Sequence, residues 1–178
     1  MSKINISILS CTSQTNLTLS EQIAEVCREK LNSEYPQATS NCEVLNIEKL
    51  DLPLYTPPTE EKGIPEAAIE LSMKLQDSDV IILVAPEYNG SIPPVMTNMV
   101  AWVSRTGEDW RKSFNQKISL VASHSGGGGQ KVCQAMRSQL EHLGCLVIPR
   151  QIIVNYSKPF DKDNAHAVLA SLFKYLKA

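Results

Sequence analysis

Residues 10–18 form a polar loop whose side chains could bind a phosphate. The segment reads Ser-Cys-Thr-Ser-Gln-Thr-Asn-Leu-Thr, with hydroxyl or amide groups at most positions. From Leu17 apolar residues recur every three or four positions, which predicts that a helix begins here. A helix start offers free N–H donors and a partial positive charge, so it can hold a phosphate without lysine or arginine. We therefore expect phosphate contacts from Ser10, Ser13, Thr15, Asn16, Leu17 and Thr18.

Two other interpretations of this loop were weighed. Thr15, Asn16 or Thr18 could simply cap the helix. Cys11 could belong to a phosphatase of the type that wraps a phosphate over a thiolate and clamps it with an arginine six residues later. The residue six positions after Cys11 is Leu17. Without that arginine nothing grips the substrate oxygens, so Cys11 is better explained as a small residue that fills the loop.

Two more polar loops each follow an apolar run of the chain. Residues 80–85 lead into Pro86-Glu87-Tyr88-Asn89-Gly90-Ser91, and residues 117–122 lead into Ser123-His124-Ser125 and the glycines Gly126 to Gly129. Asn-Gly is typical of a tight turn, but a turn alone does not explain the whole first string. The glycines are contiguous and lack an acidic residue about 20 positions later, so they do not form the dinucleotide-binding fingerprint.

The three loops fall at one edge of the predicted fold. Short apolar runs predict strands at 4–9, 43–47, 80–85, 117–123 and 146–153. Amphipathic segments with proline or glycine at their ends predict helices at 17–31, 65–76, 93–104, 132–143 and 163–176. This alternation implies an α/β parallel sheet covered on both faces. Ligands of such sheets bind beyond the carboxyl ends of the strands, and we expect one domain over residues 1–178.

Composition narrows the classes of partner. Of the 178 residues, 43% are hydrophobic and 20% charged, and the formal net charge is -2. Nucleic-acid binding is not expected, because basic side chains supply most of that affinity. The five cysteines form no C-x-x-C pair and their number is odd, which favours reduced thiols. The N-terminus lacks signal-peptide features and no run reaches the roughly 18 apolar residues of a membrane span, so we expect a cytoplasmic protein without membrane contact.

The second loop is the most specific feature of the sequence. Residues 86–93 read P-E-Y-N-x-S-x-P, with Leu52-Pro53-Leu54-Tyr55 upstream and the glycine-rich loop downstream. From about Ile4 to Pro149 the chain resembles the NADPH-dependent FMN reductase family, which includes bacterial flavin, azo-dye, chromate and quinone reductases. The resemblance implies a flavodoxin-like three-layer sandwich with a five-stranded sheet in the order 2-1-3-4-5. It also implies FMN as cofactor and NADPH or NADH as co-substrate.

The resemblance also implies roles for individual residues. In the family the P-E-Y-N loop lies against the isoalloxazine ring, which assigns that role to Pro86, Glu87, Tyr88 and Asn89, with Gly90 and Ser91 completing the loop. The glycine-rich turn approaches the same ring, which assigns Ser123, His124, Ser125 and Gly126. Two departures stand out: Ser13 replaces an arginine of the family's phosphate loop, and Pro94 and Thr97 replace a glycine and a lysine. The phosphate is therefore expected to rest on neutral donors and the helix dipole.

These features predict an oxidoreductase. Hydride transfer to flavin N5 needs no protein acid or base, so no catalytic side chain and no metal ligand is expected. One pocket that serves both substrates implies ping-pong kinetics, with quinones, azo dyes, free flavin or metal oxyanions as acceptors. The alternatives are an electron carrier like flavodoxin, which is usually markedly acidic, or a domain of this fold without flavin. The helix 93–104 carries more apolar residues than one buried stripe needs, which favours a homodimer or homotetramer.

Overall fold

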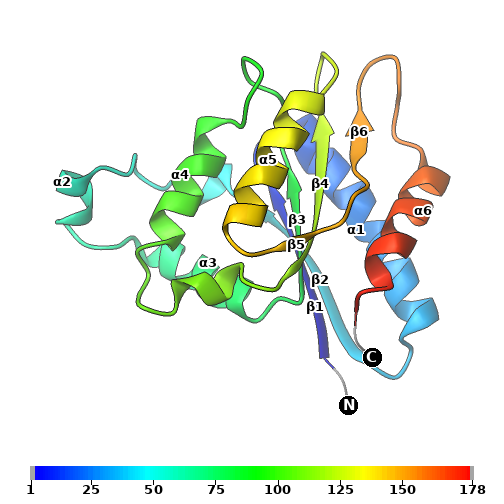
Figure 1. Ribbon diagram of the computed structural model, residues 1–178, viewed down its shortest axis with the longest axis horizontal. Coiled ribbons are helices and arrows are strands. Elements are labelled where there is room, and N and C mark those ends of the chain that lie inside the picture. The colour runs from blue at the N-terminus through cyan, green and yellow to red at the C-terminus, as the bar shows by residue number, and fades with distance from the viewer. Residues whose placement is uncertain (1–2, 177–178) are drawn as a thin grey trace.

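The computed structural model describes residues 3–176 and is built around one parallel sheet (Figure 1). Five strands follow the order β2-β1-β3-β4-β5, and a sixth, β6, also pairs with β4. This confirms the flavodoxin-like order 2-1-3-4-5 expected from the sequence. The strands are β1 (Lys3–Ser10), β2 (Thr39–Asn46), β3 (Val80–Val84), β4 (Ile118–His124), β5 (Leu146–Val147) and β6 (Ile152–Val154).

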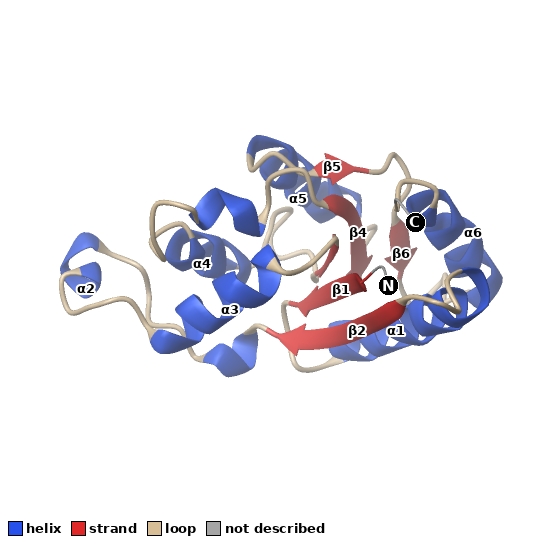
Figure 2. Cartoon of the chain, turned by 90° about the horizontal axis from the view of Figure 1, so that it is seen from below, coloured by secondary structure: helices blue, strands red, loops and turns tan. Residues whose placement is uncertain are grey.

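Helices cover both faces of the sheet, which confirms the three-layer sandwich (Figure 2). One face carries α1 (Thr15–Glu34) and α6 (Lys162–Phe173), and the other carries α3 (Glu66–Gln76), α4 (Pro94–Val103) and α5 (Gln130–His142). The short helix α2 (Pro57–Glu60) lies at the tip of an extension away from the sheet. Two 3-10 turns complete the chain, η1 (Glu48–Leu50) and η2 (Trp110–Ser113). Within residues 3–176, no helix combines the length and apolarity needed to cross a bilayer.

The central strands are apolar on both sides because each side faces a helical layer. In β3, Val80, Ile82 and Val84 pack toward α1 and α6, whereas Ile81 and Leu83 pack toward α3, α4 and α5. Successive side chains of a strand point to opposite faces, so a continuous apolar run is what a sheet buried on both faces requires. The loops at the strand ends are thereby fixed to a rigid support.

The predicted fifth strand, 146–153, is divided in the structure. Pro149 cannot donate a ladder hydrogen bond, so regular pairing stops there. The Arg137 guanidinium occupies the break, donating to the carbonyl oxygens of Val147, Ile148 and Pro149 at 3.4, 2.8 and 3.3 Å. The chain then rejoins the sheet as β6, beside the carboxyl end of β4. Because of this break, the last strand supports the glycine-rich loop.

Candidate functional site

The three polar loops meet in one pocket of about 320 Å³ at the carboxyl ends of the strands, at the top of Figure 1. That volume lies within the usual range of small-molecule sites. Predicted residues that line it are Ser13, Thr15, Asn16, Pro86, Glu87, Tyr88, His124, Ser125 and Gly126. Three lining residues were not predicted: Thr12, Gln14 and Glu48. The other predicted residues lie outside the wall, with Ser10 and Ser123 fully buried behind it and Leu17, Thr18, Asn89, Gly90 and Ser91 beside it.

The first loop presents the start of α1 to the pocket without a cap. The helix begins at Thr15, two residues before the predicted start, because the apolar stripe begins later than the helical backbone. Its N-cap is Gln14, which makes no side-chain capping bond, so the alternative that Thr15, Asn16 or Thr18 caps the helix is wrong. Within residues 3–176, the N–H groups of Thr15 and Asn16 have no hydrogen-bond acceptor. They remain free for an anion.

The buried Asn16 side chain ties the first loop to the third. Its Nδ2 donates to the His124 carbonyl oxygen and its Oδ1 accepts from the His124 N–H, both at 2.9 Å. This pair of bonds joins positions 108 residues apart in sequence. The Asn16 side chain therefore positions the two loops. Of the polar groups of Asn16, only the backbone N–H is left to bind an anion.

A buried serine pair ties the second loop to the third. Ser125 Oγ accepts from the Glu87 N–H at 2.8 Å and shares a 2.7 Å hydrogen bond with Ser123 Oγ. The Glu87 carboxylate accepts from the N–H groups of Lys131 and Val132 at the start of α5, at 3.2 and 3.4 Å. Gly129 allows this packing, because a Cβ on it would lie 3.2 Å from Ser123 Oγ and its φ is +68°. Glu87 thus lines the pocket while its carboxylate is fixed at the start of α5.

Tyr88 is held at the pocket rim by a tight turn. Asn89 and Gly90 both have positive φ, 50° and 78°, and Tyr88 exchanges two backbone hydrogen bonds with Ser91 at 3.1 and 3.0 Å. Two consecutive positive φ angles are the mark of a type I′ turn, which Asn-Gly adopts readily. Tyr88 as a whole residue is 50% exposed. It is therefore available to cover a flat ligand.

Of the three lining residues that were not predicted, Glu48 is the one outside the polar loops. Its carboxylate accepts from the Ser13 N–H at 2.7 Å, while Asn46 Nδ2 donates to Ser13 Oγ at 3.0 Å. Hydrogen bonds from Ser13 lower the pKa of Glu48 below its ordinary value, so the carboxylate is ionised at neutral pH. Among residues 3–176, no lysine or arginine lines the pocket. The sequence could have indicated Glu48, because it closely follows β2. The carboxyl end of β2 lies beside that of β1 in a parallel sheet, and therefore beside the first loop.

Cys11 is buried and packs in the core below the pocket. Burial raises the pKa of the Cys11 thiol to about 12. At pH 8 the thiolate fraction is then about one in ten thousand, too small for a nucleophile. We expect iodoacetamide to leave Cys11 unmodified in the folded protein and to label it after denaturation, as mass spectrometry would detect. Rapid labelling of Cys11 in the native protein would show an accessible, reactive thiol and would favour the phosphatase interpretation.

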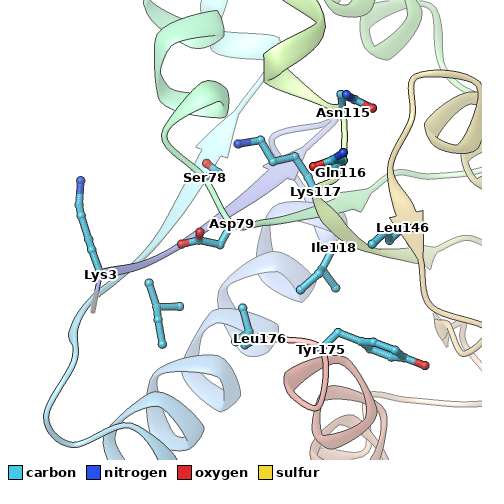
Figure 3. Close-up of a pocket in the computed structure, with 11 residues that line it drawn as sticks. Lys3, Ser78, Asp79, Asn115, Gln116, Lys117, Ile118, Leu146, Tyr175 and Leu176 are labelled. Carbon is cyan, nitrogen blue, oxygen red and sulfur yellow. The ribbon is translucent and has the colours of Figure 1, made fainter. Parts of the chain in front are cut away.

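A larger hollow of about 620 Å³ lies at the opposite, amino ends of the strands (Figure 3). Its two lysines are engaged: Lys3 Nζ donates to the Asp77 carboxylate at 2.6 Å and Lys117 Nζ donates to the Gln76 carbonyl oxygen at 2.7 Å. None of the three motif loops reaches it. Open α/β sheets bind ligands at the carboxyl ends of their strands, so the smaller pocket is the candidate site.

Comparisons with known proteins show the family to which the chain belongs. Residues 5–158 match the family model of the NADPH-dependent FMN reductases. A quinone reductase of Pseudomonas putida is 30% identical over 70% of this chain and 68% of its own length. A 2-hydroxy-1,4-benzoquinone reductase of a Burkholderia species is 25% identical over 71% of this chain and 69% of its own length.

Solved structures support the same fold. The flavoenzyme FerB of Paracoccus denitrificans, an NAD(P)H:acceptor oxidoreductase, superposes with a TM-score of 0.75 at 18% identity, covering 98% of this chain and 97% of its own. An archaeal flavodoxin superposes with a TM-score of 0.60 at 12% identity, covering 95% and 99%. At these identities the solved structures show only the fold. The family match, which covers residues 5–158, shows the family. The chain therefore belongs to the NADPH-dependent FMN reductase family, as an oxidoreductase that uses FMN and reduced nicotinamide.

Proposed function

We propose that this enzyme binds FMN across the pocket and uses NAD(P)H to reduce quinones and similar flat acceptors by ping-pong kinetics. The observation that carries the proposal is the convergence of three loops, from three separate strand ends, on one pocket. The pocket lies beside β1 and β3, where the strand order of this fold reverses and nucleotides of flavodoxin-like proteins bind. Pro86, Glu87 and Tyr88 of the P-E-Y-N-x-S-x-P string form part of its wall.

The start of α1 fits a phosphate. The helix has no acidic residue in its first turn and no side-chain cap, and the N–H groups of Thr15 and Asn16 are free within residues 3–176. The helix dipole and these donors favour an anion here. Thr12 and Ser13 add hydroxyl groups on the same side of the pocket. We assign the FMN phosphate to residues 12–16.

The opposite side of the pocket fits an aromatic ring with a polar edge. The exposed face of Tyr88 supplies an aromatic wall, and the glycines 126–128 leave the third loop without side chains. Asn89, Gly90 and Ser91 stand beside the pocket and hold Tyr88 in place through their turn. We assign the isoalloxazine ring to residues 86–88 and 124–126.

The reaction needs no acid or base catalysis from the side chains. FMN supplies the two-electron chemistry when it is bound, so the chain needs to bind, orient and shield rather than to transfer a proton. Tyr88 and His124 both line the pocket and limit where a nicotinamide or a quinone can stack. Because one open face serves both substrates, the nicotinamide product has to leave before the acceptor enters.

Steady-state kinetics tests the proposal. With FMN-loaded enzyme, NADPH and a small benzoquinone varied together, we expect parallel double-reciprocal lines. Parallel lines follow if the two substrates use one position in turn. Lines that intersect would show that both substrates bind at once and would overturn the single-pocket mechanism. The names of the similar quinone reductases support this choice of acceptor.

Self-association stays a proposal, and the apolar surface of α4 first suggested for it is mostly buried, with Val95 and Val100 partly exposed. Met96, Met99, Trp102 and Val103 of α4 are fully buried within one chain. The second apolar stripe of the helix is covered by the extension around Pro53, whose carbonyl oxygen accepts from Trp102 Nε1 at 2.6 Å. Most of the apolar excess on α4 is therefore buried inside the chain, and its partly exposed part stays a candidate contact.

The extension and α3 offer a different surface for a homodimer or homotetramer. Leu54 and Met73 are 72% and 66% exposed, and Ile69 is also exposed on the same helix as Met73. Ile69 and Met73 lie four residues apart on the same face of α3, and an exposed apolar face of a helix favours association. We expect sedimentation at micromolar concentration to give a mass above the 19.7 kDa of one chain, and Met73→Glu to lower it. A 19.7 kDa species alone would rule out the oligomer.

The state of the cysteines supports a cytoplasmic location. All five cysteines are free and buried. Free thiols persist where the compartment is reducing, as the bacterial and eukaryotic cytosol are. We propose that the enzyme works there, on small-molecule acceptors.

A further inference from the structure

We propose that Glu48 competes with the phosphate of FMN for the Ser13 N–H, so that this residue sets how strongly the pocket prefers phosphorylated flavins over riboflavin. The inference rests on the proposed FMN site. It concerns a residue outside the motif loops, placed in the pocket only by the fold. The observation that carries it is the hydrogen bond from the Ser13 N–H to the Glu48 carboxylate at 2.7 Å.

The carboxylate lies among the donors that suit the phosphate. Thr12, Ser13, Gln14, Thr15 and Asn16 line the pocket together with Glu48. Asn46 completes the arrangement by donating to Ser13 Oγ at 3.0 Å. Glu48 thus takes one donor of the loop, and a phosphate that used this donor would have to displace it.

The charges make the competition stronger. A phosphate monoester carries between one and two negative charges at neutral pH, and Glu48 is ionised there because Ser13 lowers its pKa. Among residues 3–176, the only other charged side chain on the pocket wall is Glu87, whose carboxylate is held at the start of α5. Without a cation between them, the two anions repel each other at close range. Riboflavin has no phosphate and escapes this repulsion.

The position of Glu48 lets it act without shaping the ring site. It lies on η1, directly after β2, whereas the ring side of the pocket is built from residues 86–88 and 124–126. Its removal is therefore expected to change the phosphate contribution and to leave the ring contribution unchanged. The difference between FMN and riboflavin affinity isolates this effect.

Calorimetric titration of Glu48→Gln with FMN and with riboflavin tests the inference. Glutamine keeps the size of the side chain, removes the charge and leaves only a weaker, neutral acceptor for the Ser13 N–H, and Glu48→Ala removes that acceptor as well. We expect FMN to bind about tenfold tighter than to the unmodified protein, with riboflavin affinity unchanged within twofold. Glu70→Gln, an exposed carboxylate on α3 that does not line the pocket, should change neither affinity.

The outcomes distinguish a failure of the Glu48 inference from a failure of the proposed FMN site. If both flavins bind and Glu48→Gln leaves the ratio of their affinities unchanged, Glu48 does not compete with the phosphate and this inference is wrong. If neither flavin binds to either protein, the proposed FMN site itself fails. A gain that is equal for FMN and riboflavin would place the effect of Glu48 on the ring and would also overturn the inference.

Discussion

Replacing Asn16 by alanine is expected to destabilise the fold and to weaken FMN binding together. The change removes both hydrogen bonds of Asn16 with the His124 backbone and leaves a buried N–H and C=O unpaired. Losses of this kind cost on the order of 3 kcal/mol. For a chain of this size the melting temperature should fall by roughly 6 to 12 °C, as scanning calorimetry of flavin-free protein would measure.

A matched control is available on the same helix. Asn32 is exposed on α1, and Asn32→Ala should leave both melting and FMN affinity close to those of the unmodified protein. An Asn16→Ala protein that melts normally would mean that the first and third loops do not depend on this contact.

Tyr88→Ala is expected to weaken FMN binding about tenfold or somewhat more while the flavin-free protein melts normally. Stacking of an aromatic ring contributes about 1 kcal/mol of binding free energy beyond that from the apolar area it buries. Tyr88 is half exposed and its turn is held by backbone bonds with Ser91, so the ring is not a core anchor. Fluorescence titration with FMN and thermal melting of the same variant measure the two effects.

Two further variants sharpen this prediction. Tyr88→Phe keeps the aromatic face and should keep most of the affinity. Tyr175→Ala removes another exposed tyrosine, at the opposite end of the sheet, and should change nothing. Unchanged FMN affinity in Tyr88→Ala, with a collapsed melting temperature, would make Tyr88 a structural residue instead.

Much of the fold could be predicted because local patterns and layer packing agree. The apolar run 80–85 could only be a strand buried on both faces, and it forms β3 at the centre of the sheet. Polar loops at strand ends had to lie together in a parallel sheet, and the pocket joins all three. Element starts were less accurate, as at Thr15, because the apolar stripe marks buried residues rather than the first helical turn.

The remaining errors come from contacts between distant segments. No local pattern reveals that the Asn16 amide is used by His124, 108 residues away, or that Glu48 reaches Ser13 across β2 and β1. Nor does a local pattern reveal that the segment around Pro53, 49 residues upstream of Trp102, covers part of the apolar surface of α4. The break of the last strand at Pro149 depends likewise on the Arg137 side chain of another element.

An anaerobic titration of FMN-loaded protein with NADPH tests the central claim most directly. If the pocket at the carboxyl ends of the strands holds FMN within reach of a nicotinamide, the visible flavin absorption should bleach with one equivalent of NADPH per bound FMN, and one equivalent of benzoquinone should restore it. NADH run in parallel gives the nicotinamide preference. Protein that binds FMN but keeps its full visible absorption under excess NADPH and NADH would contradict the account.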